Sequence, residues 1–148
     1  MATISEYAPK TVSHPGQTLG YKIQELEMSV KEFAIRASKP EKTIIAVIKG
    51  DSSITPDMAV AFENVTRIPA HFWMARQRKY DEAVAREKME AKISESFDWA
   101  ERFPFAQMVK YGWIEKVKGK GEKVKSLLQF FALSSSDAWH NYYMGQQL

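Results

Sequence analysis

The side chains that most often perform catalysis or bind metals are few in this chain and poorly spaced for either task. The histidines, His14, His71 and His140, have no second metal-type ligand three or four residues away, apart from acidic residues typical of a charged surface. No cysteine is present, which excludes disulfides and cysteine-based zinc sites. Asp81 and Glu82 fit a solvated helix face better than an acid–base pair, and no Ser-His-Asp order or nucleotide loop is visible. We therefore expect no enzymatic activity, no metal and no cofactor.

The positive charge of the chain is unevenly distributed. The formal net charge is +3, but residues 14–66 hold six Lys and Arg against seven Asp and Glu, whereas residues 67–148 hold 14 against 10. Six lysines lie between Lys110 and Lys125, against two glutamates. Such a cluster is usually a solvated surface, and the functional alternative is an electrostatic contact with DNA flanks or with an acidic partner.

Length and composition favour a folded protein with one domain and an extension, or with two small domains. Of the 148 residues, 45% are hydrophobic and 12% are aromatic, which supports a real core. No apolar run approaches the roughly 18 residues that a membrane span needs, and the N-terminus lacks a secretory apolar segment. We expect a cytoplasmic protein with a flexible arm at 1–13, a domain at 14–94 and a helical region at 95–148.

Helical periodicity and capping residues predict three short helices before residue 50. The first begins at residues 14–16, and the second begins after Ser29, which is followed three residues later by the glutamate of a capping box. A turn at 38–40 precedes the third helix at 41–48, and Gly50 can end that helix. The residues expected to face inward are Leu19, Ile23, Leu26, Val30, Phe33, Ala34, Ala37, Ile44, Val47 and Ile48.

Similar signals predict the remaining elements. A hydroxyl cap at Thr55 starts a fourth helix, and Pro69 starts a fifth that continues to about Ile93. The second half predicts helices at 105–110 and 122–133, followed by a last helical turn that Ser136 can cap. No segment alternates with period two for long enough to form a strand, so the predicted fold class is all-α.

The ordered combination of these features resembles the HigA-type antitoxins, which belong to the Xre, or lambda-repressor-like, helix-turn-helix class. The resemblance covers about half of the chain, and the residues that carry it are His14-Pro15-Gly16, the two-helix unit through Gly50, Ile54-Thr55-Pro56, Phe72-Trp73 and Tyr80-Asp81. It implies a five-helix DNA-binding domain that forms a homodimer, represses its own operon and neutralises a RelE-like ribonuclease toxin. Phe72 and Trp73 are expected in the core or at a dimer seam, with toxin binding as the alternative.

The resemblance places the third helix in the major groove of double-stranded operator DNA, with its first residues at the base edges. Glu41, Lys42 and Ala46 then hold positions that commonly face bases. Glu41 can accept a hydrogen bond from a cytosine amino group, and Lys42 can donate to guanine. Thr43 and Lys49 hold positions where phosphate contacts are common. The full set of DNA-binding residues predicted in this way is Lys31, Glu41, Lys42, Thr43, Ala46, Lys49 and Ser52.

Several positions depart from the family pattern. Ser38 and Lys39 stand where the turn usually has a glycine and an apolar residue. Pro40 replaces a Ser or Thr cap, and Val30 replaces a glutamine. Ile45 falls on the outward side of the third helix, where a polar residue is usual. Exposure of Ile45 would favour an alternative function, in which the fold binds a toxin or another regulator with weak or no DNA specificity.

The second half resembles the connector of longer Xre-type regulators, in which a metallopeptidase domain of the ImmA/IrrE kind follows. This resemblance rests on residues 105–114 and 128–139. The chain contains no His-Glu-x-x-His motif, so zinc-dependent hydrolysis is not expected.

Overall fold

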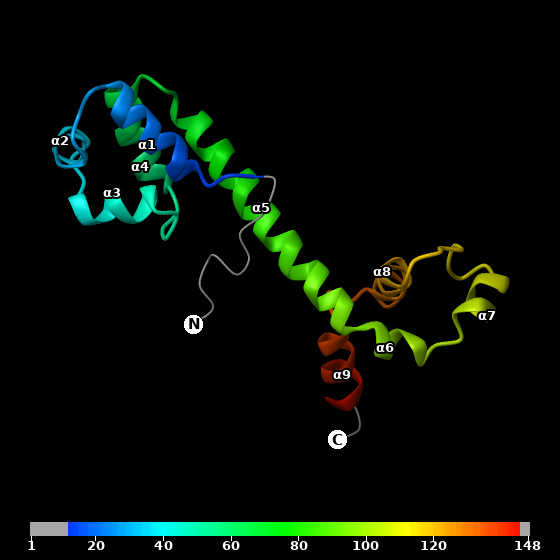
Figure 1. Ribbon diagram of the computed structural model, residues 1–148. Helices are drawn as coiled ribbons and strands as arrows, with labels where there is room; N and C mark the ends of the chain where they lie inside the picture. The colour runs from blue at the N-terminus through cyan, green and yellow to red at the C-terminus, as the bar shows by residue number, and fades with distance from the viewer. Residues whose placement is uncertain (1–11, 146–148) are drawn as a thin grey trace. The chain divides into compact units, whose positions relative to one another are not determined.

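The computed structural model describes residues 12–145, and this part of the chain folds into helices joined by short turns (Figure 1). The all-α prediction is confirmed, and none of the described helices is long and apolar enough to cross a membrane. The predicted N-terminal arm, residues 1–13, lies outside the described residues except for its last two positions. The helices are α1 (Pro15–Glu25), α2 (Val30–Arg36), α3 (Glu41–Ile48), α4 (Pro56–Thr66), α5 (Ala70–Glu95), α6 (Phe97–Glu101), α7 (Phe105–Lys110), α8 (Lys120–Phe131) and α9 (Ser136–Gly145).

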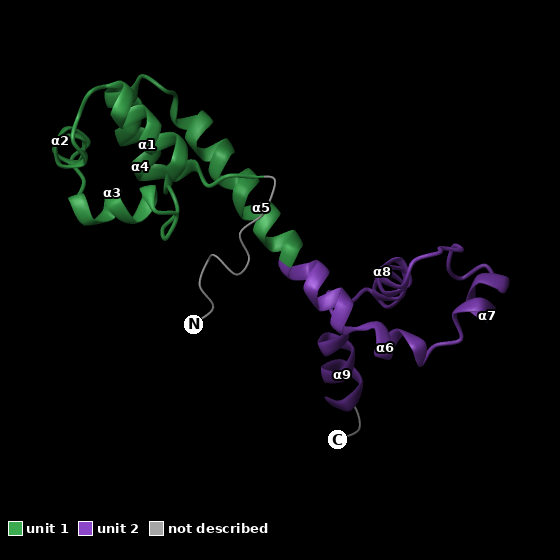
Figure 2. Ribbon diagram, viewed as in Figure 1, with its two compact units in different colours: residues 1–87 green, residues 88–148 purple. Residues whose placement is uncertain are grey.

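The helices group into two compact units, unit 1 at residues 1–87 and unit 2 at residues 88–148 (Figure 2). The division falls inside α5, which contributes its first part to unit 1 and its last part to unit 2. The sequence predicts a boundary at residue 94, near the end of the same helix. Each unit has a hydrophobic core of its own.

The core of unit 1 is built from the inward stripes of α1 to α5. The rings of Phe33 and Phe62 lie 5.4 Å apart, and those of Phe62 and Trp73 lie 5.9 Å apart. Trp73 is fully buried, as predicted, whereas Phe72 is 40% exposed and does not lie in the core. Its alternative placement at a dimer seam stays a prediction. Adjacent residues of a helix point about 100° apart, and Trp73 is the one of the two that faces the core of unit 1.

Side chains cap the starts of three helices, and two of these caps, Ser29 and Thr55, were predicted. Each accepts a hydrogen bond from a backbone N–H of the first turn: His14 from Gly16 at 2.9 Å, Ser29 from Glu32 at 3.0 Å and Thr55 from Met58 at 3.2 Å. The carboxylate of Glu32 forms an ion pair with Arg36 at 3.0 Å. Among the described residues, only the Ser29 half of the predicted capping box is therefore observed.

A close backbone approach joins the start of α1 to the end of α3. A Cβ atom on Gly16 would lie 1.8 Å from the carbonyl oxygen of Val47 and 2.7 Å from its carbonyl carbon. Both are main-chain atoms, so no side-chain rotation could relieve the clash. Gly20, one turn later in α1, would place a Cβ atom 3.5 Å from Cγ2 of Ile48, an ordinary contact. The position of α3 against α1 therefore depends on the absence of a side chain at residue 16.

Unit 2 has a core of aromatic and aliphatic side chains from the end of α5 through α8. Its buried members are Ile93, Trp99, Met108, Val124, Leu127 and Leu128. The helix at Phe97–Glu101 was not predicted from the sequence, because its one buried residue, Trp99, gives no periodic stripe. The helix predicted at 105–110 is confirmed, and the one predicted at 122–133 is observed at Lys120–Phe131.

The start of α9 differs from the prediction in its cap. Ser135 accepts the N–H of Ala138 through its hydroxyl at 3.3 Å, and this places the cap one residue before the predicted Ser136. The hydroxyl of Ser136 lies 2.9 Å from that of Ser96, so it is already used in a contact with the segment that follows α5. The capping role therefore passes to the preceding serine.

We expect Gly16→Ala and Gly20→Ala to change stability in opposite directions. Gly16→Ala forces a backbone shift and should lower the free energy of unfolding by roughly 3 kcal/mol. Gly20→Ala has room for its methyl group and should raise that free energy by about 0.5 kcal/mol, because alanine favours a helix interior. Urea unfolding followed by circular dichroism measures both. Equal effects of the two variants would contradict the close approach.

Candidate nucleic-acid interface

The second and third helices form a two-helix unit whose turn is fixed by backbone hydrogen bonds. The N–H of Lys39 donates to the carbonyl of Ala34 at 2.9 Å, and the N–H of Ser38 donates to that of Ile35 at 3.1 Å. This pair of hydrogen bonds is typical of a helix C-terminus that ends in one residue with left-handed backbone. Ser38 is that residue, with φ +54°. Serine thus performs the task usually given to glycine, at a steric cost.

The third helix, α3, presents one face to the core and the other to solvent. Ile44 and Val47 are fully buried. The helix ends at Ile48, and Gly50, two residues later, has φ +83°. The predicted C-terminal glycine is therefore confirmed. Its left-handed backbone directs the chain away from the helix axis into the loop toward Ile54.

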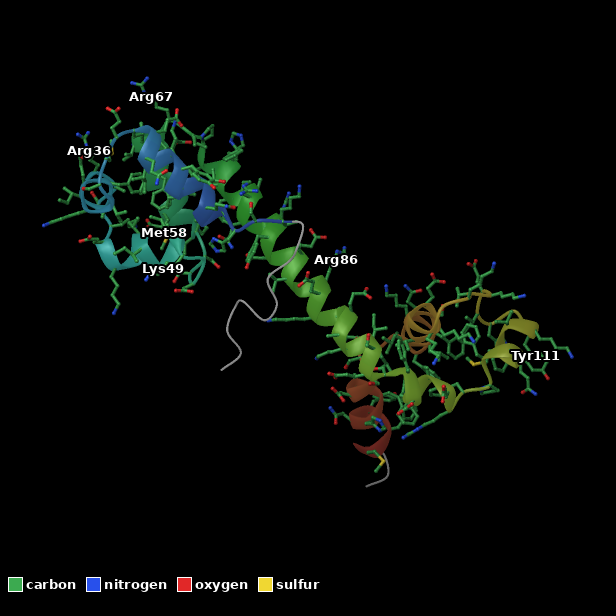
Figure 3. All side chains as sticks on the ribbon, viewed as in Figure 1. Arg36, Lys49, Met58, Arg67, Arg86 and Tyr111 are labelled. Atoms are coloured by element: carbon green, nitrogen blue, oxygen red, sulfur yellow. The ribbon has the colours of Figure 1, made fainter. Side chains whose placement is uncertain are left out.

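All the predicted DNA-binding residues lie on α2, on α3 or in the loop after α3. The exposed ones are Lys31, Glu41, Lys42 and Lys49, and the half-buried ones are Thr43, Ala46 and Ser52. Figure 3 labels Lys49 beside the end of α3. Because this set is local in sequence, the fold brings it together without distant segments. Whether these residues contact DNA stays a prediction.

The charges of this region are partly neutralised by ion pairs. Arg36 pairs with Glu32 on α2, and Lys39 pairs with Asp57 at the start of α4. In the described part of the chain, the lysines that make no ion pair in this region are Lys31, Lys42 and Lys49. The unpaired cations are therefore the ones that the sequence assigned to DNA.

Two isoleucines on the helix-turn-helix unit are open to solvent. Ile45 on α3 is 37% exposed, so the apolar residue on the outward side of α3 is accessible. Ile35 on α2 is 70% exposed and was not singled out from the sequence. The signal was available, because the stripe that buries Phe33 and Ala34 leaves Ile35 on the opposite side of α2.

Residues from α5 hold the loop that follows α3. The buried amide of Gln77 accepts the N–H of Ile54 at 2.8 Å and donates to Asp81 at 2.9 Å. The ring of Tyr80 packs edge-on against His14, with centroids 4.8 Å apart. These contacts connect α5 with the start of α1 and with the loop that follows α3.

Burial lowers the pKa of His14 below its ordinary value of 6.5, with the carboxylate of Asp81 opposing the shift. The Nδ1 atom must be unprotonated to accept the N–H of Gly16. The folded state therefore favours the neutral ring that caps α1.

We expect Ser38→Gly to raise the free energy of unfolding by about 1 kcal/mol, because it relieves a left-handed serine. A matched control is Ala75→Gly on the exposed side of α5, which has no left-handed backbone and should lose about 1 kcal/mol. Urea unfolding compares the two variants with the wild type. A lower free energy of unfolding in Ser38→Gly than in the wild type would show that the left-handed conformation of Ser38 does not destabilise the turn.

We expect the stability of unit 1 to fall at acidic pH through His14. Its folded pKa lies below the unfolded value, so its stabilising contribution is complete above about pH 6.5 and is lost as the pH falls through the folded pKa. His14→Asn keeps a good capping residue but removes the titration. Urea unfolding at a series of pH values should give a steeper acid-side loss for the wild type than for His14→Asn. Parallel curves would contradict the assignment.

No family model and no curated protein matches the chain, but solved structures do. An addiction-module antidote protein of the HigA family from Coxiella burnetii is 30% identical with a TM-score of 0.52, over 56% of this chain and 91% of that protein. The Pseudomonas aeruginosa antitoxin HigA, solved with the higBA promoter, is 25% identical with a TM-score of 0.52, over 56% of this chain and 91% of that one.

Proposed function

Because the chain belongs to the HigA family of helix-turn-helix antitoxins, we propose that unit 1 binds double-stranded operator DNA as a homodimer and represses its own operon. The observation that carries this proposal is the exposed face of α3. The helix buries Ile44 and Val47 and leaves Glu41 and Lys42 in solvent at its N-terminal end, the end that reads base edges in this class.

The charge of unit 1 supports a binding mode of moderate electrostatic strength. Residues 1–87 hold twelve Lys and Arg against eleven Asp and Glu, because the start of α5 adds basic residues to the slightly acidic segment before it. Lys31, Lys42 and Lys49 of each protomer are available for phosphates or bases. A homodimer doubles their number, and this is why we propose that two copies bind one operator.

The family also supports a role as an antitoxin. We propose that the partner is a RelE-like ribonuclease toxin and that it contacts apolar side chains left open on unit 1. Ile35 and Phe72 are exposed and take no part in the proposed DNA contacts. Aromatic and aliphatic side chains of this kind form the centres of protein interfaces.

We expect the purified protein to shift a DNA fragment from upstream of its own gene in a gel-shift assay. Lys42→Gln should weaken this binding by about tenfold, because it removes a donor at the base edges. The matched control is Lys79→Gln, which removes an equal charge from an exposed position of α5 and should change affinity little. A lack of sequence preference at low salt, or equal effects of both variants, would overturn DNA reading.

A second candidate function is protein binding with weak or no DNA specificity, and the exposure of Ile45 favours it. Ile45→Gln separates the two functions. If α3 reads DNA, the variant keeps operator affinity, because it adds a polar group to a polar interface. If α3 binds a protein, co-purification of the toxin encoded beside this gene falls with Ile45→Gln, and the gel shift is absent in the wild type as well.

A further inference from the structure

Three of the exposed aromatic side chains of unit 2 lie next to one another. Tyr111 is 65% exposed, Trp113 is 60% exposed and Phe130 is 45% exposed. The rings of Tyr111 and Trp113 lie 5.5 Å apart, and those of Trp113 and Phe130 lie 6.3 Å apart with planes only 12° from parallel. The three rings therefore form one continuous open surface. Figure 3 labels Tyr111 beside the end of α7.

The turn after α7 holds two of these rings in place. Gly112 has φ +77°, and the N–H of Trp113 returns to the carbonyl of Met108 at 2.9 Å. This hydrogen bond closes the helix end and fixes the backbone on both sides of the glycine. The third ring is anchored to the core, because Phe130 contacts Phe131 with centroids 5.1 Å apart. The surface is thus formed in advance of any binding event.

Lysines outnumber acidic residues in the sequence around Tyr111 and Trp113, where Glu115 is the one carboxylate between Lys110 and Lys118. Lys110 precedes Tyr111 directly, and Lys116 and Lys118 follow Trp113 within five residues. All three lysines are exposed, and within residues 12–145 none of them takes part in an ion pair. Other lysines of the cluster are already used, since Lys125 pairs with Glu90 at 2.9 Å.

We propose that the aromatic–lysine surface, formed by Tyr111, Trp113, Phe130, Lys110, Lys116 and Lys118, binds single-stranded nucleic acid. Exposed aromatic faces stack with unpaired bases, and lysines beside them neutralise the phosphates between those bases. Duplex DNA hides its base faces, so the open rings suit a single strand. This proposal does not depend on operator binding by α3.

The charge of the surface argues against its being covered by a second copy of the chain. A self-complementary interface would bring the lysines of one copy near the lysines of the other, and like charges at an interface oppose association. An anionic occupant is required. An acidic protein would meet the charge but would leave the flat aromatic faces without planar partners, so we favour the nucleic acid.

The test measures the binding of fluorescently labelled 15-nucleotide oligothymidine and oligouridine to the full chain, by fluorescence anisotropy at low salt. We expect Trp113→Ala to weaken binding by about tenfold, because stacking on one aromatic ring carries roughly that effect. Trp113→Phe should retain most of the affinity, since it keeps an aromatic face. The matched control is Tyr142→Ala, which removes an exposed aromatic from α9 of the same unit and should leave affinity unchanged.

Three results would overturn the proposal: no binding of either oligonucleotide, equal affinity in Trp113→Ala and the wild type, or equal losses in Trp113→Ala and Tyr142→Ala. A polyglutamate peptide serves as the acidic-protein probe. If it binds as tightly as the oligonucleotides and depends equally on Trp113, the surface is a site for acidic proteins. Circular dichroism of each variant checks that unit 2 remains folded.

Discussion

The position of α3 depends on one missing side chain. Gly16 lets the first turn of α1 approach the main chain of Val47 to a distance that no Cβ atom would tolerate. Since Val47 is also a core residue, the same contact sets the depth of α3 in the core and the orientation of its outer face. His14 and Pro15 fix the start of the same turn through a cap and a restricted backbone angle. The residues His14-Pro15-Gly16 therefore start α1 and also set the distance between α1 and α3.

Much of unit 1 could be predicted because its signals are local. Caps, stripes and the terminal glycine of α3 each depend on residues a few positions apart. The role of Gly16 could not be predicted, since a sequence does not show which backbone lies opposite a glycine. Phe72 and Trp73 show the same limit. Both are aromatic residues in one helix, and only the packing of unit 1 decides that Trp73 is buried while Phe72 is not.

The location of the candidate site could be predicted from the sequence, but the net charge of the unit around it could not. Its residues are neighbours in sequence, so any fold that forms α2 and α3 brings them together. Counted over residues 14–66, the helix-turn-helix segment has a slight excess of acidic residues. Unit 1 extends to residue 87 and therefore also includes basic residues of α5. In unit 2, Trp99 and Trp113 are the same residue type in neighbouring elements, yet one lies in the core and the other in solvent. Composition alone does not distinguish them.

The division of the chain inside α5 affects how it can be recombined. Residues 87 and 88 are consecutive positions in the interior of α5, where each backbone N–H of a helix bonds to the carbonyl four residues earlier. Domain insertion and exchange succeed mostly at exposed loops, and the described chain has no loop at this point. The boundary between the two units is therefore a poor site for exchanging unit 2 with another domain. A fusion made at this boundary would have to join onto α5, a helix that already packs in unit 1 through Trp73.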